Sequence, residues 1–309
     1  MSVSLIIATF NHAQFLAVAL DSALAQTLAG VEVIVVDDGS TDDTPAVLSR
    51  YTDRVRVIRQ ANRGLAAARN AGLAAARGTY VSFLDADDVV TPTKLAEQVA
   101  LLEAAPTVGW TYCDVLIETV ATGHEMRASE RFGYGGRTLD GWLFPELIHG
   151  NFIPAIAPLI RRTALDSAGG FDDRLTALED WDLWLRLSLV AEARYSPAVL
   201  VRYRVHPGGM SEDRSRMDRN RFRVLDKLCR TRAAAVEGLG AVGRRIIADT
   251  HNWLGKEAYA RGDWTEARRR FAASLATVPW QRQAPMLLGL SLVRAGARIG
   301  TGAPTPGPR

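Results

Sequence analysis

Short apolar runs alternate with longer helical patterns over the first 90 residues. Val3–Ala8, Val31–Val36 and Tyr80–Leu84 are rich in β-branched and aromatic residues. Such near-continuous apolar runs are typical of strands buried on both faces of a sheet. Arg54–Arg59 predicts a further strand of more polar character. Because the segments between these runs have the length of helices, the pattern predicts βαβ units and a mostly parallel sheet.

Three helices are expected between these strands. The first carries apolar residues on one face, and Asn11 is placed to cap it. The second begins at Thr41 or Asp42 and ends near Tyr51, and the third is the alanine-rich Gly64–Arg77. If these helices connect parallel strands, the loops that follow the strands meet at one edge of the sheet, where such sheets bind ligands.

Residues 91–207 continue the alternation with less regular spacing. Residues 118–140 are polar and contain several glycines, which predicts a loop. Trp181 and Trp184 fall on one face of a helix expected over residues 178–187, so this face should be buried. The other expected elements are helices over Thr93–Ala105 and Arg161–Ala168 and strands over Val108–Ile117, Ala155–Ile160 and Ala193–Tyr203.

The charge changes sign along the chain. Residues 201–309 contain 21 Lys and Arg but 9 Asp and Glu, whereas residues 1–200 contain 16 and 25. An acidic first part suits a metal site, and a basic second part suits an anionic surface or partner. We therefore expect three regions: a first domain over 1–207 with halves 1–90 and 91–207, a basic helical domain over 208–299, and a disordered tail over 300–309.

One segment of the helical domain has the spacing of a tetratricopeptide (TPR) repeat. Ala258 stands where this pattern normally has tyrosine, and Tyr259 follows it. Only one clear copy is present, and repeats of this kind usually need neighbours to bury their faces. We therefore expect a helical hairpin rather than an array. The matching positions are Leu254, Gly255, Gly262, Ala267, Phe271 and Pro279.

Composition narrows the class of protein. With 309 residues, 48% hydrophobic and 23% charged, the chain reads as an ordinary soluble protein of about two domains. The first residues lack the basic region of a signal peptide, and no window reaches the ~18 apolar residues of a membrane span. Cys113 and Cys229 match no metal or redox spacing, so reduced thiols are expected. We predict a cytoplasmic protein.

Three carboxylates follow the last apolar run. Tyr80–Leu84 ends in Asp85, Asp87 and Asp88. Carboxylates this close repel one another unless a cation lies between them, and Mg²⁺ is usually held by one or two carboxylates together with substrate phosphates. The alternative is a solvated acidic turn before the next helix. The stretch alone leaves both interpretations open.

The loops after the earlier strands exclude two classes of nucleotide enzyme. The sequence T-F-N-H-A after the first strand has neither G-x-G-x-x-G nor G-x-x-x-x-G-K-[ST], which disfavours a dinucleotide-binding oxidoreductase and a P-loop ATPase. Asp38 is suited to a uracil N3–H or a ribose hydroxyl, or simply to a turn. Arg69 is suited to a base or phosphate contact, or to a surface ion pair.

Taken together, these motifs resemble glycosyltransferase family 2. V-S-L-I-I-A-T-F-N, V-I-V-V-D-D-G-S-T-D-D-T, N-R-G-L-A-A-A-R-N-A-G and F-L-D-A-D-D stand in the order and spacing of that family through residue 90, and a further match covers residues 150–206. The resemblance implies the α/β GT-A fold, here with a small C-terminal all-α domain. It also implies a nucleotide-sugar donor, a divalent metal and inversion at the anomeric carbon.

The resemblance also implies roles for the donor-side residues. Thr9 and Asp38 would contact the nucleoside, and Arg69 would lie near the base. Asn11 is also expected to bind the donor. Asp85 would hold the ribose, directly or through the metal. The cofactor would be Mn²⁺ or Mg²⁺, and a bound cation would stabilise the leaving diphosphate as a Lewis acid. The uridine nucleotide is favoured through Asp38 and Arg69.

Asp87 would be the main ligand of this metal. His206, in Y-R-V-H, would complete its shell or bind the diphosphate, and Arg202 or Arg204 would neutralise leaving-group charge. In L-E-D-W-D-L-W the resemblance makes Asp180 the general base, with Glu179 in support. The interpretation from the residues alone is a helix N-terminus, where negative charge is favourable.

The expected function is that of an inverting transferase acting in bacterial cell-surface polysaccharide synthesis, and two alternatives remain. A sugar-nucleotide pyrophosphorylase would have a glycine-rich, basic loop after the first strand, which T-F-N-H-A is not. A non-catalytic scaffold would act through the helical domain, but the occupied positions Asp85, Asp87 and Asp180 argue against it. Expected partners are a glycan or lipid-linked acceptor and, through the basic domain, an anionic membrane surface or a protein. No nucleic-acid partner is expected.

Overall fold

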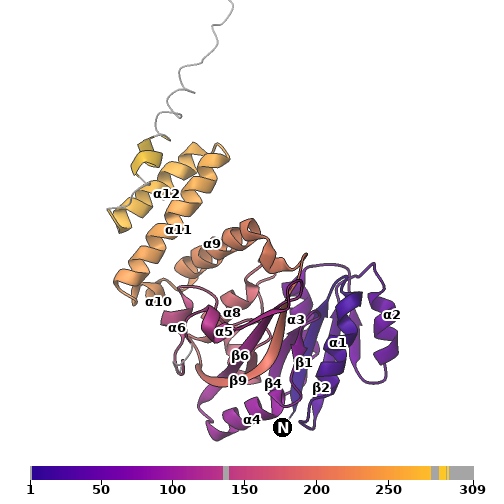
Figure 1. The fold of residues 1–309 in the computed structure, drawn as a ribbon. Helices are drawn as coiled ribbons and strands as arrows, with labels where there is room; N and C mark the ends of the chain where they lie inside the picture. Colours follow the sequence, from indigo (N-terminus) through magenta and orange to yellow (C-terminus); the bar gives the residue numbers. More distant parts are fainter. Residues whose placement is uncertain (1, 135–138, 280–284, 290, 292–309) are drawn as a thin grey trace, which may run out of the picture. The chain divides into compact units, whose positions relative to one another are not determined.

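The computed structural model describes residues 2–134, 139–279, 285–289 and 291. The chain divides into two compact units, residues 1–217 and residues 218–309 (Figure 1). The first unit is a sheet flanked by helices, and the described part of the second is helical. The predicted α/β class with a helical C-terminal part is confirmed.

In the described residues, the first unit contains one nine-stranded sheet with the order β3-β2-β1-β4-β8-β6-β9-β5, and β7 pairs with β6. Its first half is parallel. β1 (Val3–Thr9) lies between β2 (Val31–Asp37) and β4 (Tyr80–Asp85), and β3 (Arg56–Arg59) pairs with β2. All residues of β1 are buried, as expected for a central strand covered on both faces.

The register of these strands sets the position of the polar loops. Thr9 is opposite Asp37, and Ala8 is opposite Asp85. Three neighbouring parallel strands therefore end level with one another. Their loops meet at the carboxyl edge of the sheet, where the motifs of the sequence predicted a ligand.

The second half of the sheet is mixed. β6 (Val108–Thr119) pairs in parallel with β9 (Glu192–Val205) and antiparallel with β8 (Pro158–Arg161), which in turn pairs with β4. The short β5 (Val89–Val90) pairs antiparallel with β9, so that Val89 is opposite Arg202. Because β5 directly follows the acidic loop, this pairing brings the end of β9 to that loop.

The helices expected in the first unit are present. α1 spans Ala13–Leu24, and its N-terminal amide, Ala13 N–H, donates to Asp42 Oδ2 at 3.0 Å. The prediction that Asn11 caps this helix is wrong, because the Asn11 side chain bonds to the loop after β2 instead. The other helical segments are α2 (Thr44–Leu48), η1 (Ser49–Tyr51), α3 (Leu65–Ala75), α4 (Lys94–Ala104), α6 (Phe144–Leu147), α7 (Arg162–Ala168), α8 (Glu179–Leu187) and η2 (Met210–Glu212).

The prediction of a loop over residues 118–140 is also partly wrong. The chain turns back through Gly123, whose φ of 67° suits glycine, and β7 (His124–Arg127) pairs with β6. The short helix α5 (Ala128–Arg131) follows. Residues 135–138 of the expected loop lie outside the described residues.

Two tryptophans anchor α8. Trp181 and Trp184 are buried, as predicted, and their indole N–H groups donate to the carbonyls of Leu147 (2.7 Å) and Ile153 (3.0 Å). Trp110 of β6 stacks on Trp184 with ring centroids 5.9 Å apart. Buried aromatic rings with satisfied N–H groups hold a helix firmly. The N-terminus of α8, which carries the acidic pair, is therefore fixed against the sheet.

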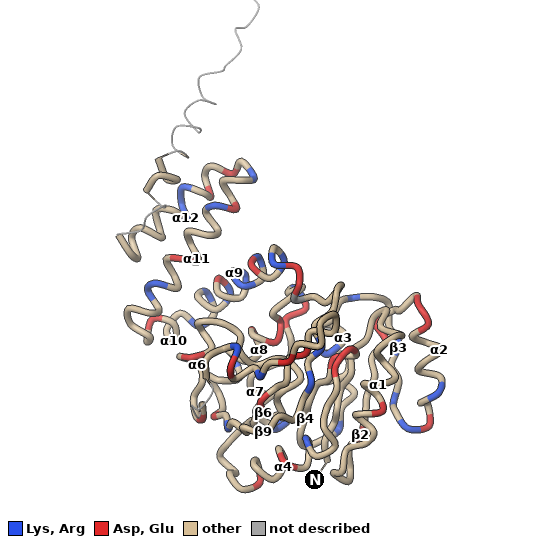
Figure 2. Tube along the Cα trace, in the orientation of Figure 1, with Lys and Arg blue, Asp and Glu red and all other residues tan. Residues whose placement is uncertain are grey.

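The second unit contains α10 (Ala233–Glu237), α11 (Ala241–Ala260), α12 (Trp264–Thr277) and most of α9 (Arg214–Thr231), whose Lys and Arg positions appear blue in Figure 2. α11 and α12 form the expected hairpin. Phe271 is fully buried against Gly255, where an added Cβ would lie 2.6 Å from its ring. Asp263 caps α12 by accepting from Glu266 N–H.

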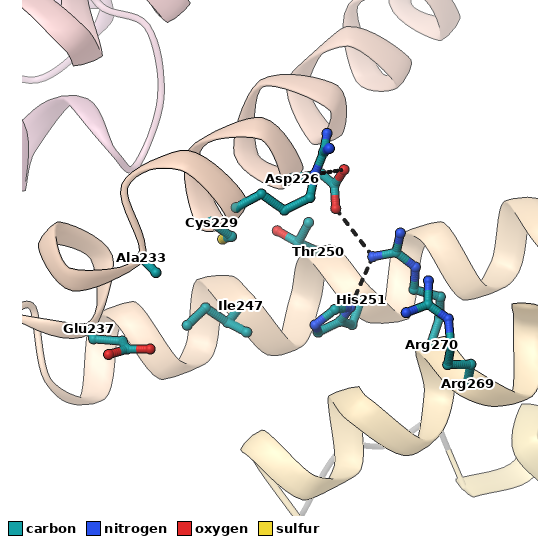
Figure 3. Close-up of a pocket in the computed structure, with 10 residues that line it drawn as sticks. Asp226, Cys229, Ala233, Glu237, Ile247, Thr250, His251, Arg269 and Arg270 are labelled. Atoms are coloured by element: carbon teal, nitrogen blue, oxygen red, sulfur yellow. Dashed lines mark hydrogen bonds and ion pairs between the residues drawn. The ribbon is translucent and has the colours of Figure 1, made fainter.

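A cavity of about 320 Å³ lies between the helices of this unit (Figure 3). Arg270 Nη1 lies 3.2 Å from Asp226 Oδ1 and donates to His251 Nδ1 at 3.2 Å. Arg230 pairs with the other Asp226 oxygen. These interactions tie α9, α11 and α12 together. Among the described residues, none of the helices is long and apolar enough to cross a membrane.

Candidate active site

The loops after β1 and β2 are joined through Asn11. Its φ of 57° lies in the left-handed region, which asparagine adopts more readily than most residues. The Asn11 Oδ1 accepts from the backbone N–H groups of Thr41 (2.8 Å) and Asp42 (3.3 Å), and Asn11 N–H donates to Ser40 Oγ at 3.0 Å. Asn11 thus shapes the edge of the sheet where a donor is expected.

Asp38 organises the loop before α3. It is 3% exposed, and its carboxylate accepts from Gln60 Nε2 (2.7 Å) and from the backbone N–H groups of Arg63 (2.9 Å) and Gly64 (2.7 Å). A carboxylate offers about four lone-pair sites, so about one remains for a ligand. The position predicted for nucleoside binding is therefore also a structural support for α3.

The acidic loop after β4 has one buried carboxylate and two part-exposed ones. Asp88 is fully buried, and its Oδ1 accepts from Arg204 N–H at 2.7 Å, while Oδ2 has no partner. Burial and the charges of Asp87 and Asp85 raise the pKa of Asp88 well above its ordinary value. Asp85 and Asp87 keep 23% and 20% of their side chains exposed. Asp88 thus supports the loop, and the other two remain accessible to a ligand.

The end of β9 adds a histidine and an arginine to this loop. His206 Nε2 lies 3.0 Å from Asp87 Oδ2, and its Nδ1 lies 3.1 Å from the Pro207 carbonyl. Arg204 Nε donates to the Asp87 carbonyl, and its buried Nη2 has no partner. The ring of Phe15 packs against His206 at 4.6 Å and against the Arg204 guanidinium at 5.1 Å. α1 therefore backs both side chains.

The acidic pair lies in the first turn of α8. It follows Leu178, whose φ of 58° is rare for leucine. Glu179 is buried, and its Oε2 has no partner. Asp180 is part-exposed, its Oδ1 accepts from Trp181 N–H at 2.7 Å, and its Oδ2 accepts from Asn151 Nδ2 at 2.9 Å. Asp180 is thus held in a defined orientation while remaining accessible.

The surroundings of Asp180 weaken its acidity. Burial and the negative charge of Glu179 raise the pKa of Asp180 to about 7, against the opposing charge of Arg69 and the hydrogen bond from Asn151. A general base works best when its pKa lies near the operating pH. Asp180 therefore has the electrostatics of an acid–base group.

Arg69 lies between the acidic loop and α8. Its side chain is 3% exposed, with Nη2 2.5 Å from Asp85 Oδ1 and Nη1 2.7 Å from Glu179 Oε1. The guanidinium also lies 5.4 Å from the ring of Phe171. The residue following it, Asn70, exchanges hydrogen bonds with the backbone N–H and carbonyl of Phe171 at 2.9 Å each. Arg69, predicted to lie near a base, is buried between the two carboxylates of Asp85 and Glu179.

This combination of sheet edge and carboxylates agrees with a comparison of the chain with known families. The model of glycosyl transferase family 2 matches residues 4–158. The chain belongs to this family. A family 2 relative, the uncharacterized glycosyltransferase RP339 of Rickettsia prowazekii, is 33% identical over 207 residues, which cover 66% of this chain and 64% of RP339. The chain thus spans less than two thirds of that relative.

The name of another relative states its donor and its acceptor. The UDP-Glc:alpha-D-GlcNAc-diphosphoundecaprenol beta-1,3-glucosyltransferase WfaP of Escherichia coli is 32% identical over 69% of this chain and 80% of WfaP. Among solved structures, S. aureus TarS 1-349 in complex with UDP-GlcNAc matches with a TM-score of 0.65 at 18% identity, covering 97% of this chain and 88% of TarS 1-349. At this identity, the likeness to TarS shows the fold alone.

A further solved structure that matches contains a metal ion. Mannosyltransferase PcManGT from Pyrobaculum calidifontis, in complex with GDP-Man and Mn²⁺, matches with a TM-score of 0.58 at 22% identity, over 95% of this chain and 80% of PcManGT. In this family 2 chain, the described residues contain no cluster of three or more His, Cys, Asp or Glu able to hold a metal.

The residues present nevertheless fit a cation that shares its ligands with a substrate. Mg²⁺ needs only one or two protein carboxylates when phosphates complete its shell. Adjacent ligands in an octahedral Mg²⁺ site are about 2.9 Å apart, and Asp87 Oδ2 and His206 Nε2 are 3.0 Å apart. If His206 Nδ1–H donates a hydrogen bond to the Pro207 carbonyl, the Nε2 lone pair of the imidazole faces Asp87 and can ligate a cation there.

Two residues of the site were missed from the sequence. Asn151 holds Asp180, and Phe15 packs behind His206 and Arg204. Asn151 opens N-F-I-P, where an asparagine before an apolar strand gives no spacing signal. Phe15 belongs to the apolar face of α1 and could only be assigned to the core.

Proposed function

We propose that the chain transfers a glycosyl group from a nucleoside-diphosphate sugar to a hydroxyl acceptor, with inversion at the anomeric carbon. One observation carries this proposal: Arg69 pairs with Asp85 of the acidic loop and with Glu179 of α8. It thereby joins the loop that holds the Asp87–His206 pair to the helix that holds Asp180, a part-exposed carboxylate with a raised pKa. The name of WfaP supports a UDP-sugar donor and an acceptor bearing a diphosphate-linked lipid, as in bacterial surface polysaccharide synthesis.

Buried polar atoms without partners support donor binding at this edge. Thr9 Oγ1 at the end of β1 and Arg204 Nη2 on β9 are both buried and unpaired. Such groups cost stability unless a ligand or water satisfies them, so a donor bound there would recover hydrogen bonds. We assign Thr9, Asn11 and Asp38 to the nucleoside and Arg204 to the diphosphate.

Asp87 and His206 would hold Mn²⁺ or Mg²⁺, with Asp85 as a third ligand or as the ribose contact. When bound, the cation would neutralise charge that develops on the departing diphosphate. Arg204 lies beside Asp87 and would add a second positive charge there. The part-exposed side chains of Asp85 and Asp87 keep this position open to a substrate.

Asp180 would act as the general base. As the acceptor oxygen forms its bond to the anomeric carbon, its proton passes to Asp180, and the bond from that carbon to the diphosphate oxygen breaks with its electron pair. Asn151 and Trp181 N–H hold the two carboxylate oxygens, which fixes the direction of proton transfer. Glu179 supports this base through its pairing with Arg69.

The regional roles are part of the same proposal. Residues 1–90 would bind the nucleotide sugar, and residues 91–207 would bind the acceptor. Residues 208–299, with their excess of Lys and Arg, would contact an anionic surface or partner, and the α11–α12 hairpin would be a single TPR-like unit.

A transfer assay tests this function. Wild-type protein is incubated with UDP-glucose, UDP-GlcNAc or GDP-mannose, Mn²⁺ or Mg²⁺, and a diphosphate-linked lipid glycan, and the product anomer is determined by NMR. We expect nucleoside diphosphate release and an inverted product with one donor, lost in Asp87→Asn but retained in the exposed control Asp173→Asn. Release that is unaffected by Asp87→Asn, or a product with retained configuration, would contradict the proposal.

A further inference from the structure

Arg69 joins the two sides of the candidate site. It belongs to α3, its partner Asp85 ends β4, and its partner Glu179 begins α8, 110 residues further along the chain. Ala66, Ala67 and Ala68 around it are buried, so this turn of α3 faces the interior. One guanidinium therefore spans the gap between the strand that ends in the donor-side carboxylates and the helix that carries the base.

We infer that Arg69 is a positioning residue, which ties Asp85 to Glu179 and thereby sets Asp180 at the correct distance and orientation from the bound donor. This inference rests on the proposed transfer reaction and deepens it. The planar guanidinium offers several N–H donors in a fixed fork, and two of its nitrogens are used for carboxylates on opposite sides. A lysine ammonium in the same place is a point charge without that geometry.

The position of the Arg69–Glu179 ion pair explains how it affects the catalytic rate. Glu179 is the first residue of α8 and Asp180 the second, and the buried tryptophans make this helix rigid. A shift at Glu179 is therefore passed to Asp180. Misplacing a reacting group by about 1 Å can lower a rate about 100-fold.

The charge of Arg69 also affects the protonation of Asp180. Asp180 faces Arg69 from α3, Glu179 from its own helix and the neutral amide of Asn151. Loss of the Arg69 cation leaves Asp180 beside Glu179 without compensation, which favours the protonated and inactive form of the base.

The test compares Arg69→Lys with Arg186→Lys. Arg186 is also a largely buried arginine, but it pairs with Asp182 within α8 and donates to the Ala168 carbonyl, away from the donor-side carboxylates. We expect Arg69→Lys to lower kcat by about 100-fold, with donor Kd changed by less than about threefold, roughly 0.6 kcal/mol. We expect Arg186→Lys to retain kcat. Wild-type kcat in Arg69→Lys would overturn the inference.

A pH profile separates positioning from loss of folded protein. In Arg69→Met, the acidic limb of kcat should move to higher pH, whereas partial unfolding lowers kcat equally at all pH values. If Arg69→Met does not fold, the double variant Arg69→Met/Glu179→Gln takes its place. Because it also lacks the Glu179 charge that raises the pKa of Asp180, its limb should lie at or below the wild-type position while kcat stays low. An unshifted limb in folded Arg69→Met, or wild-type kcat in the double variant, contradicts the inference.

A double-mutant cycle on the free energy of unfolding tests the Arg69–Glu179 interaction without an activity assay. Urea unfolding of wild type, Arg69→Lys, Glu179→Gln and the double variant should give effects that are not additive, since the two residues act as one unit. Additive effects would contradict the inference that Arg69 and Glu179 act as one unit. A wild type that transfers no sugar from any donor would instead contradict the proposed function, while the cycle would still report on the tie.

Discussion

His206 Nε2 lies 3.0 Å from Asp87 Oδ2, although 119 residues separate them along the chain. The contact depends on β5, which follows the acidic loop and pairs antiparallel with β9, so that the strand delivers His206 to Asp87. Phe15 closes the other side of the imidazole. The sheet thus brings a carboxylate and a histidine together from distant motifs.

We predict that His206→Ala weakens metal-dependent donor binding. Removing a residue that shapes a metal shell typically lowers metal affinity by about 10- to 100-fold. Calorimetric titration of UDP with Mn²⁺ should show this loss in His206→Ala, while His251→Ala, which changes a histidine in the second unit, should bind as wild type. An unchanged nucleotide dissociation constant in His206→Ala would remove this residue from the donor site.

We predict that Asp180→Asn separates binding from turnover. Asparagine keeps the shape of the side chain but cannot take a proton, and general-base help is worth about 10²- to 10⁴-fold. Turnover should fall by that factor while the donor dissociation constant stays near the wild-type value. Equal turnover on an acceptor that the wild type uses would exclude Asp180 as the base.

The pH dependence of turnover follows from the same carboxylate. Asp180 must be ionised to accept a proton, and burial beside Glu179 raises its pKa to about 7. Turnover should therefore rise with pH through about 7 and level off above it. In Asn151→Ala the carboxylate loses a hydrogen bond that favours its charged form, so the limb should move to higher pH. A flat profile between pH 5.5 and 8.5 under metal saturation, roughly 1.5 units either side of that pKa, would contradict the assignment.

The parallel half of the sheet could be predicted because its strands are apolar on both faces. β1 is buried throughout, so its sequence is apolar without the spacing that would indicate a helix. β7 gave no such signal, since all four of its residues, His124–Arg127, are polar or exposed, and it forms only because β6 extends far enough to pair with it.

The positions of the motif residues could be predicted better than their partners. Parallel strands that end level with one another bring Thr9, Asp37 and Asp85 to one edge. The partners of Arg69 could not be predicted, because a helical pattern shows that Arg69 lies on α3 but not which distant carboxylates its side chain reaches. Those depend on how α3 and α8 pack on the sheet.

Lys94 gives a prediction about stability rather than catalysis. It is fully buried on α4, and its ammonium donates to Ser82 Oγ and Gln98 Oε1, each at 2.9 Å, without a carboxylate partner among the described residues. Burial lowers the pKa of Lys94 to about 8. Between pH 8 and about 10.4, the unfolded lysine holds a proton that the folded one has released. The unfolded chain binds more protons there, so this lysine makes stability rise with pH.

The measurement is the difference in unfolding free energy between wild type and Lys94→Met. Both proteins carry Cys113→Ala, because Lys94 and the Cys113 thiol perturb each other's pKa. The difference then cancels the titration of Cys229, whose raised pKa acts in the opposite direction in both proteins. Between pH 8 and about 10.4, wild type should gain at most about 1.4 kcal/mol per pH unit relative to Lys94→Met, since at most one proton is linked to unfolding. Below pH 7 the difference should be constant. A constant difference across the whole range would show that Lys94 titrates alike in the folded and unfolded chain.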